Sequence, residues 1–181
     1  TAPLSDGGSV ITGYTVQYAT SRSGPWYEAA ISGQSATSAT TSVALSGLSA
    51  STDYWFRVAA TTAEGTGAYS LPYGTPGAPN GISATAGSGS ATVSWTAPTE
   101  TGGAAISSYK VTAYTDSAGT TAATGMTNPQ TVSSGGSFTG LTTGTTYYFR
   151  VSAVNAVGTG DASAVSSGVA PYTTASAPTA V

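Results

Sequence analysis

Apolar and polar residues alternate with a period of two along most of the chain. The clearest run is residues 147–154. Tyr147, Phe149, Val151 and Ala153 share one face there, and the other face carries Tyr148, Arg150, Ser152 and Val154. Because successive side chains of a strand point to opposite faces of a sheet, this alternation predicts half-buried β-strands. Gly and Pro clusters interrupt the runs at short intervals, and no segment combines helical periodicity with helix caps. The sequence therefore predicts an all-β fold.

The second half of the chain shows this pattern most completely. We expect seven short strands there, near residues 80–86, 90–96, 106–116, 119–125, 131–139, 146–155 and 162–170. Seven strands in roughly 95 residues favour an immunoglobulin-like sandwich. The chain has no cysteine, so it cannot have the Cys…Trp…Cys spacing of a true immunoglobulin domain.

The chain also contains an internal repeat. The run YWFRV at residues 54–58 returns as YYFRV at residues 147–151, and a Gly-Thr-Gly triplet follows each copy. The opening Thr-Ala-Pro is repeated at residues 96–98, and Tyr14 matches Tyr109. Such self-similarity indicates tandem modules.

The two copies are not equally long, because residues 76–95 have no counterpart before Thr1. We therefore expect an incomplete module at 1–75 that lacks its first two strands, a complete module at 76–174, and the start of a further module or a linker at 175–181. Without those strands, an apolar sheet face and a strand edge would be exposed at a cost in free energy. We expect that 1–75 does not fold alone and takes strands from chain preceding Thr1 or from another protomer by strand addition. The upstream segment is favoured, because the C-terminal tail is too short to supply two strands.

In combination, these features resemble tandem fibronectin type III modules of the bacterial kind. Trp95 lies on the second expected strand, and Leu141 with Tyr147 six residues later resembles the family's leucine and corner tyrosine. The resemblance covers 76–174 and, for the later five strands, 1–75. It implies a core that includes Trp95, Tyr109, Leu141, Tyr147 and Val151.

Charge limits the classes of partner. Only 6% of the 181 residues are charged, against about 25% in ordinary globular proteins. Four Lys and Arg residues against seven Asp and Glu residues give a net charge of −3, so we expect no nucleic-acid partner. The weak net repulsion removes one barrier to self-association.

No apolar run reaches the roughly 18 to 20 residues of a membrane-spanning helix, so we expect no membrane span in this segment.

The missing residue types argue against catalysis. The chain has no histidine and no cysteine, which excludes a Ser-His-Asp triad, a thiolate nucleophile and the usual zinc sites. The carboxylates are scattered along the chain, at Asp6, Glu28, Asp53, Glu64, Glu100, Asp116 and Asp161. We therefore expect no enzyme activity, no metal and no cofactor.

Three aromatic residues are the candidates for a surface contact. Trp55 and Tyr148 fall on the outward face of the repeated strand, and Tyr114 falls on a strand that neighbours Tyr148 in this fold. Exposed aromatic side chains can stack on sugars or anchor a protein contact. The alternative, which we favour, is that they pack against loops or the next module.

These features favour a structural role over binding. We expect a non-catalytic, secreted spacer segment of a bacterial cell-surface protein, whose partners are neighbouring modules or copies of itself in a filament or surface layer. Three prolines in residues 71–79 predict a short, stiff connection between the modules. The alternative is an accessory module of a secreted enzyme or adhesin that binds surface glycans or proteins.

Overall fold

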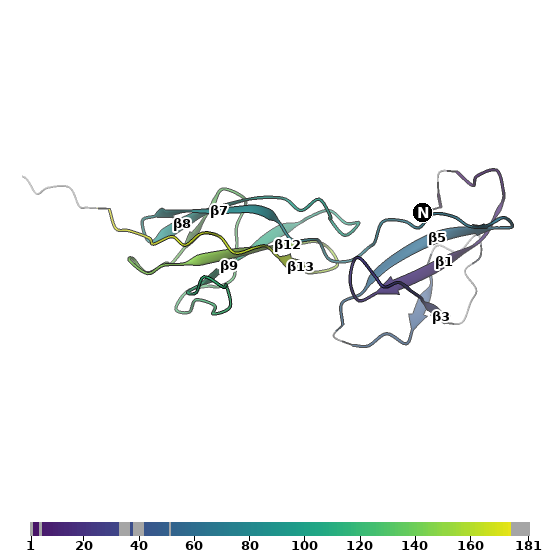
Figure 1. The fold of residues 1–181 in the computed structure, drawn as a ribbon, viewed down its shortest axis with the longest axis horizontal. Helices are drawn as coiled ribbons and strands as arrows, with labels where there is room; N and C mark the ends of the chain where they lie inside the picture. Colours follow the sequence, from purple (N-terminus) through teal and green to yellow (C-terminus); the bar gives the residue numbers. More distant parts are fainter. Residues whose placement is uncertain (1, 4, 33–36, 38–41, 51, 175–181) are drawn as a thin grey trace, which may run out of the picture. The chain divides into compact units, whose positions relative to one another are not determined.

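The computed structural model describes residues 2–3, 5–32, 37, 42–50 and 52–174. The chain divides into two compact units, Thr1–Gly74 (unit 1) and Thr75–Val181 (unit 2). Within the described residues each unit consists of strands and loops without a helix, as Figure 1 shows. The all-β prediction is therefore confirmed. The further module or linker expected at 175–181 lies outside the described residues.

Unit 2 is a sandwich of two antiparallel sheets. One sheet has the strand order β10-β9-β12-β13 and the other the order β11-β8-β7. The strands are β7 (Asn80–Gly87), β8 (Ser90–Thr96), β9 (Ser108–Tyr114), β10 (Gln130–Thr131), β11 (Gly136–Thr139), β12 (Tyr148–Val154) and β13 (Thr159–Ala162). Phe138 of one sheet meets Phe149 of the other edge to face, with ring centroids 5.4 Å apart.

The core of unit 2 contains the residues that the family resemblance implies. Val151 is fully buried, and Trp95, Leu141 and Tyr147 are at most 8% exposed. Tyr109 is half-buried and packs on Trp95, with ring centroids 5.1 Å apart. Tyr147 also makes the corner contact, because its hydroxyl accepts the Thr142 N–H at 3.2 Å. These core predictions are confirmed.

Three of the seven expected strands differ from the prediction. The strand expected at 131–139 is divided into β10 and β11, which belong to different sheets. Residues 119–125 form no ladder, and only Ala122 forms an isolated bridge, to Tyr114. The reason is local: the carboxylate of Asp116 accepts the N–H groups of Thr120 and Thr121 and holds this segment in a turn.

The expected strand at 162–170 is regular only in its first residue. Beyond β13 the chain returns alongside β12. Ser163 and Ser166 donate their N–H groups to the carbonyls of Val151 and Phe149, and Val169 donates to Tyr147, the residue before β12. Three residues of this returning segment thus advance past two residues of β12, so no regular ladder forms. Two serine hydroxyls take the place of backbone acceptors: those of Ser163 and Ser166 accept the N–H groups of Val151 and Phe149 at 3.0 and 2.9 Å.

Unit 1 has the same central strands in a smaller assembly. One sheet has the order β2-β1-β5-β6, and a separate pair is formed by β3 and β4. The strands are β1 (Ile11–Ala19), β2 (Tyr27–Glu28), β3 (Ala30–Ser32), β4 (Ala44–Ser46), β5 (Trp55–Thr62) and β6 (Gly65–Thr66). By the internal repeat, β1, β5 and β6 correspond to β9, β12 and β13. Among the described residues, unit 1 has no strands that correspond to β7 and β8.

Candidate interaction surfaces

Trp55 is covered by other parts of unit 1, in agreement with the packing role that we favoured for it. Its side chain is only 8% exposed. The chain returns beside β5, where Phe56 and Tyr73 exchange backbone hydrogen bonds, and the backbone of Gly74 then lies against the indole. The guanidinium of Arg22 lies 5.8 Å from the ring centroid. Packing against a loop, the alternative reading of this residue, therefore describes Trp55.

Tyr148 and Tyr114 are brought together by the register of unit 2. They are direct partners on the antiparallel strands β12 and β9, so their side chains project from the same face of the sheet. Both are half-buried. Tyr148 packs over Gly168 of the returning segment, where an added methyl group would lie 2.8 Å from the ring.

Arg57 covers the outward face of β5 in unit 1. Its guanidinium lies 4.3 Å from the ring centroid of Trp26 and 4.4 Å from that of Tyr69. It also donates two hydrogen bonds to the side-chain oxygen of Gln17, its partner on β1. These two cation–π contacts hold the Arg57 side chain against the outward face of the sheet.

The opposite, inner faces of the two units differ in burial. The inner face of unit 2 consists of Tyr109, Val111, Ala113, Phe149, Val151 and Ala153. Apart from half-buried Tyr109, all of these are fully buried. The matching inner face of unit 1 consists of Tyr14, Val16, Tyr18, Phe56, Val58 and Ala60. Val58 is 39% exposed there, and only Val16, at 8%, is buried.

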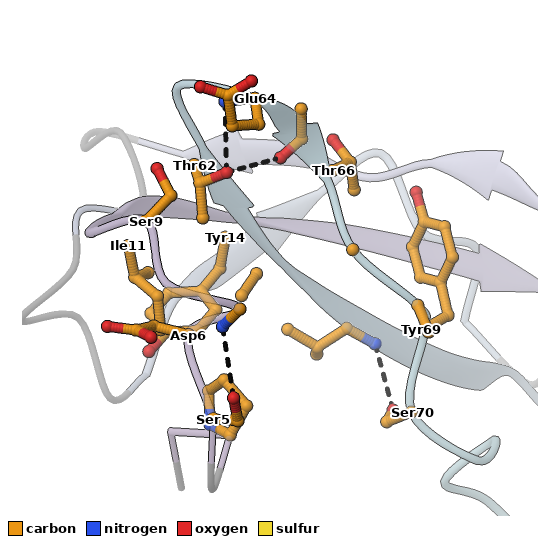
Figure 2. A pocket seen from close by; sticks show the side chains of 17 residues that line it. Ser5, Asp6, Ser9, Ile11, Tyr14, Thr62, Glu64, Thr66, Tyr69 and Ser70 are labelled. Atoms are coloured by element: carbon orange, nitrogen blue, oxygen red, sulfur yellow. Dashed lines mark hydrogen bonds between the residues drawn. The ribbon is translucent and has the colours of Figure 1, made fainter.

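A pocket of about 680 Å³ opens onto this inner face of unit 1. Figure 2 shows Ile11 and Tyr14 on one side of it and Tyr69 on the other. The pocket is lined by Pro3, Ser5, Asp6, Gly7, Ser9, Ile11, Tyr14, Val58, Ala60, Thr62 and residues 64–70. None of the three surface candidates from the sequence lines this pocket. The signal that could have found it is the unequal length of the two repeats, which predicts uncovered positions on β5.

The charged residues show one resolved electrostatic feature. Hydrogen bonds hold the pKa of Asp116 below its ordinary value of 3.8, with the backbone N–H of Thr121 as the largest cause, although desolvation acts in the opposite direction. Asp116 is half-buried, and its carboxylate stabilises the turn after β9. Among the described residues, no group of three or more acidic side chains could hold a metal ion. The described part of the chain also has no helix long and apolar enough to cross a membrane.

Comparison with solved structures gives distant similarities. The chain is similar to a structure of titin kinase and its flanking domains, with 25% identity over 54% of this chain and 17% of that one, and a TM-score of 0.41. It is similar to the chicken CNTN1 FN1-FN3 domains, with 24% identity over 93% of this chain and 59% of that one, and a TM-score of 0.35. A crystal structure of domains from titin shares 18% identity over 87% of this chain and 54% of that one, with a TM-score of 0.45.

The chain thus spans less than two thirds of each of these solved chains. Family membership rests on the sequence and not on these superpositions. The sequence model of the Fibronectin type III domain matches the chain twice, over residues 1–75 and 77–169. Together with the sandwich and corner tyrosine of unit 2, this match shows that the chain belongs to the fibronectin type III family, as a tandem pair of domains.

Proposed function

We propose that this chain is a non-catalytic structural spacer segment of an extracellular, bacterial cell-surface protein. Fibronectin type III domains are generally non-catalytic structural, spacer or binding modules, and they are commonly extracellular. The observation that carries the proposal is the repetition of one backbone arrangement within one chain. Ser70 and Ser163 make the same pair of hydrogen bonds, through backbone N–H and hydroxyl, to Val58 and Val151.

Repetition of this kind suits a role in which length matters more than a particular ligand. Stacked modules contact mainly their neighbours, so partners of such a segment are neighbouring modules or copies of itself. The low charge of the chain is compatible with close side-by-side packing in a filament or surface layer. The absence of cysteine from the sequence suits a secreted bacterial protein that cannot mispair thiols.

Mechanical unfolding of the full chain tests the spacer role. Residues 75–174 should unfold under force as one cooperative event and release about 330–360 Å of extended chain. The reason is that both sheets of unit 2 share one core around Phe138 and Phe149. Release of this length in gradual, forceless steps would contradict a load-bearing spacer.

A second candidate function is binding of surface glycans or proteins. It is favoured by the pairing of Tyr114 and Tyr148 on one face of unit 2, because adjacent half-exposed rings can stack on a sugar. In pull-down assays with insoluble polysaccharides, this function predicts retention of the full chain and its loss in Tyr148→Ala and Tyr114→Ala. Tyr172→Ala, which alters a 51% exposed tyrosine elsewhere in unit 2, is the matched control. No retention on any polysaccharide would leave the spacer role as the better account.

A further inference from the structure

The outward face of the unit 1 sheet carries a row of three polar residues on three neighbouring strands. Glu28 of β2 is the direct partner of Gln17 on β1, and Gln17 is the direct partner of Arg57 on β5. Direct partners on antiparallel strands project from the same side of a sheet, so all three side chains lie on this face. Neighbouring strands are about 4.8 Å apart, which places the backbones of Glu28 and Arg57 about 10 Å from each other.

The acidic end of this row has no partner of its own. Glu28 is exposed, and among the described residues its carboxylate makes no hydrogen bond or ion pair. An ionised carboxylate only accepts hydrogen bonds. Glu28 therefore presents an unfilled acceptor site on the outward face.

The basic end of the row is held in place but only partly used. The guanidinium of Arg57 lies against the rings of Trp26 and Tyr69, at 4.3 and 4.4 Å from the two ring centroids. It has five N–H donors, and hydrogen bonds of 3.0 and 2.7 Å to Gln17 use two of them. Within the described part of the chain, the other donors have no hydrogen-bond partner. Because the rings hold the guanidinium in place, less side-chain entropy is lost when it binds a carboxylate.

The matching position of unit 2 is used differently. Arg150, which corresponds to Arg57 in the internal repeat, donates to the backbone carbonyls of Ser163 and Ala118 at 3.0 and 2.7 Å. Its partner on β9 is Thr112, and the edge strand β10 carries no charged residue. A row with opposite charges at its two ends is therefore a feature of unit 1 and not of the repeated strand arrangement.

We propose that the outward face of unit 1 is a docking surface for the same face of a second copy of the chain. A two-fold axis that runs along β1, between two facing sheets, places Glu28 of each copy opposite Arg57 of the other. Such a contact is isologous, because both copies present the same patch. Facing sheets pack about 10 Å apart, a separation that Glu and Arg side chains span together. Trp26 and Tyr69 lie beside each charge pair, and Trp, Tyr and Arg are enriched in interface hot spots.

The order of the charges favours a second copy over a different acidic partner. An acidic segment would satisfy Arg57 but would bring like charges together at Glu28, and like-charge contacts oppose binding. The same row turned by half a turn meets both requirements. The inference rests on the proposed association of the chain with copies of itself, and it names the surface through which that association occurs.

Sedimentation equilibrium of the full chain tests this contact. A monomer–dimer equilibrium is expected, and it should weaken as the salt concentration rises from about 0.02 to about 0.5 M, because salt screens the charge pairs. Arg57→Glu and Glu28→Arg each replace two charge pairs by two like-charge contacts. Each variant alone should therefore raise the dimer dissociation constant about tenfold or more.

Mixing the two variants separates the charge contact from a loss of structure. In an equimolar mixture, the two like charges of one variant face two opposite charges of the other, so a heterodimer should form with an affinity near that of the unchanged chain. Such recovery requires that both variants are folded. Glu100→Arg, which makes the same change of charge at an exposed residue of unit 2, is the matched control and should leave the dissociation constant within about twofold.

Three results would overturn the inference, and they differ in what they leave standing. A dimer that neither single variant weakens, or a mixture that does not recover, would place the association of copies on another surface. Equal weakening by Glu100→Arg would show an effect of net charge and not of this row. A chain that stays monomeric at millimolar concentration would overturn the association with copies as well, whereas mechanical unfolding would still test the spacer role.

Discussion

Glycine at residue 160 is required by a neighbouring backbone and not by an unusual backbone angle. Gly160→Ala would place a methyl group against the Pro76 carbonyl, and overpacking of this kind typically costs about 1–3 kcal/mol. The matched control is Gly67→Ala, whose added methyl group has ordinary space in unit 1. In urea titrations that follow nuclear magnetic resonance signals of each unit, only Gly160→Ala should lower the free energy of unfolding. Equal effects of the two variants would show that the Pro76 contact is not tight.

Asp116 should make the turn after β9 sensitive to acid. Its folded-state pKa lies below the ordinary value of 3.8, so its stabilising contribution is complete above that value and is lost as the pH falls through the folded pKa. The carboxyl carbon shift of Asp116 should titrate with a midpoint below 3.8, and the Thr121 amide should titrate with it. Asp116→Asn should remove the Thr121 titration, whereas a midpoint at or above the ordinary value would contradict the hydrogen-bond assignment.

At the scale of strands, β5 and β12 carry the same sequence pattern in different surroundings. Val151→Ala removes methyl groups from a fully buried site, while Val58→Ala removes them from a 39% exposed site. We expect a loss of about 1.5–3 kcal/mol in the free energy of unfolding for Val151→Ala. For Val58→Ala, we expect less than about 1 kcal/mol. Urea titrations that follow each unit would measure both values, and similar losses would indicate that the inner face of unit 1 is already covered.

The comparison of these strands also shows what the sequence could predict. Alternation located β8, β9 and β12, because burial alternates with period two along each of them, apart from half-buried Tyr109 at the start of β9. It could not predict the returning segment, where Ser163 and Ser166 replace ladder pairing with side-chain hydrogen bonds. Alternation could also not identify what covers Trp55, because the cover comes from the backbone of Gly74 and not from a facing strand. The pocket of unit 1 depends on the relation between the two repeats, which no single run of residues records.

At the scale of the whole molecule, the two units should differ in local stability. Hydrogen exchange of the full chain should be slowest in β8, β9 and β12 of unit 2, whose inward residues are buried apart from half-buried Tyr109. It should be faster in β1 and β5 of unit 1, where the inner face is partly open. Opening free energies follow the amount of buried apolar contact around an element. Equal protection of β5 and β12 would contradict the open inner face.

The returning segment of unit 2 has a consequence for chains that carry many similar modules. Three of its residues pass for every two of β12, so its outer side offers no evenly spaced row of backbone donors and acceptors. A further strand that approached this border could not continue the register of the sheet. Regular, exposed edge strands are where neighbouring β-proteins usually pair with one another and aggregate. An irregular sheet edge of this kind therefore allows similar domains to lie close together without forming strand pairs between them.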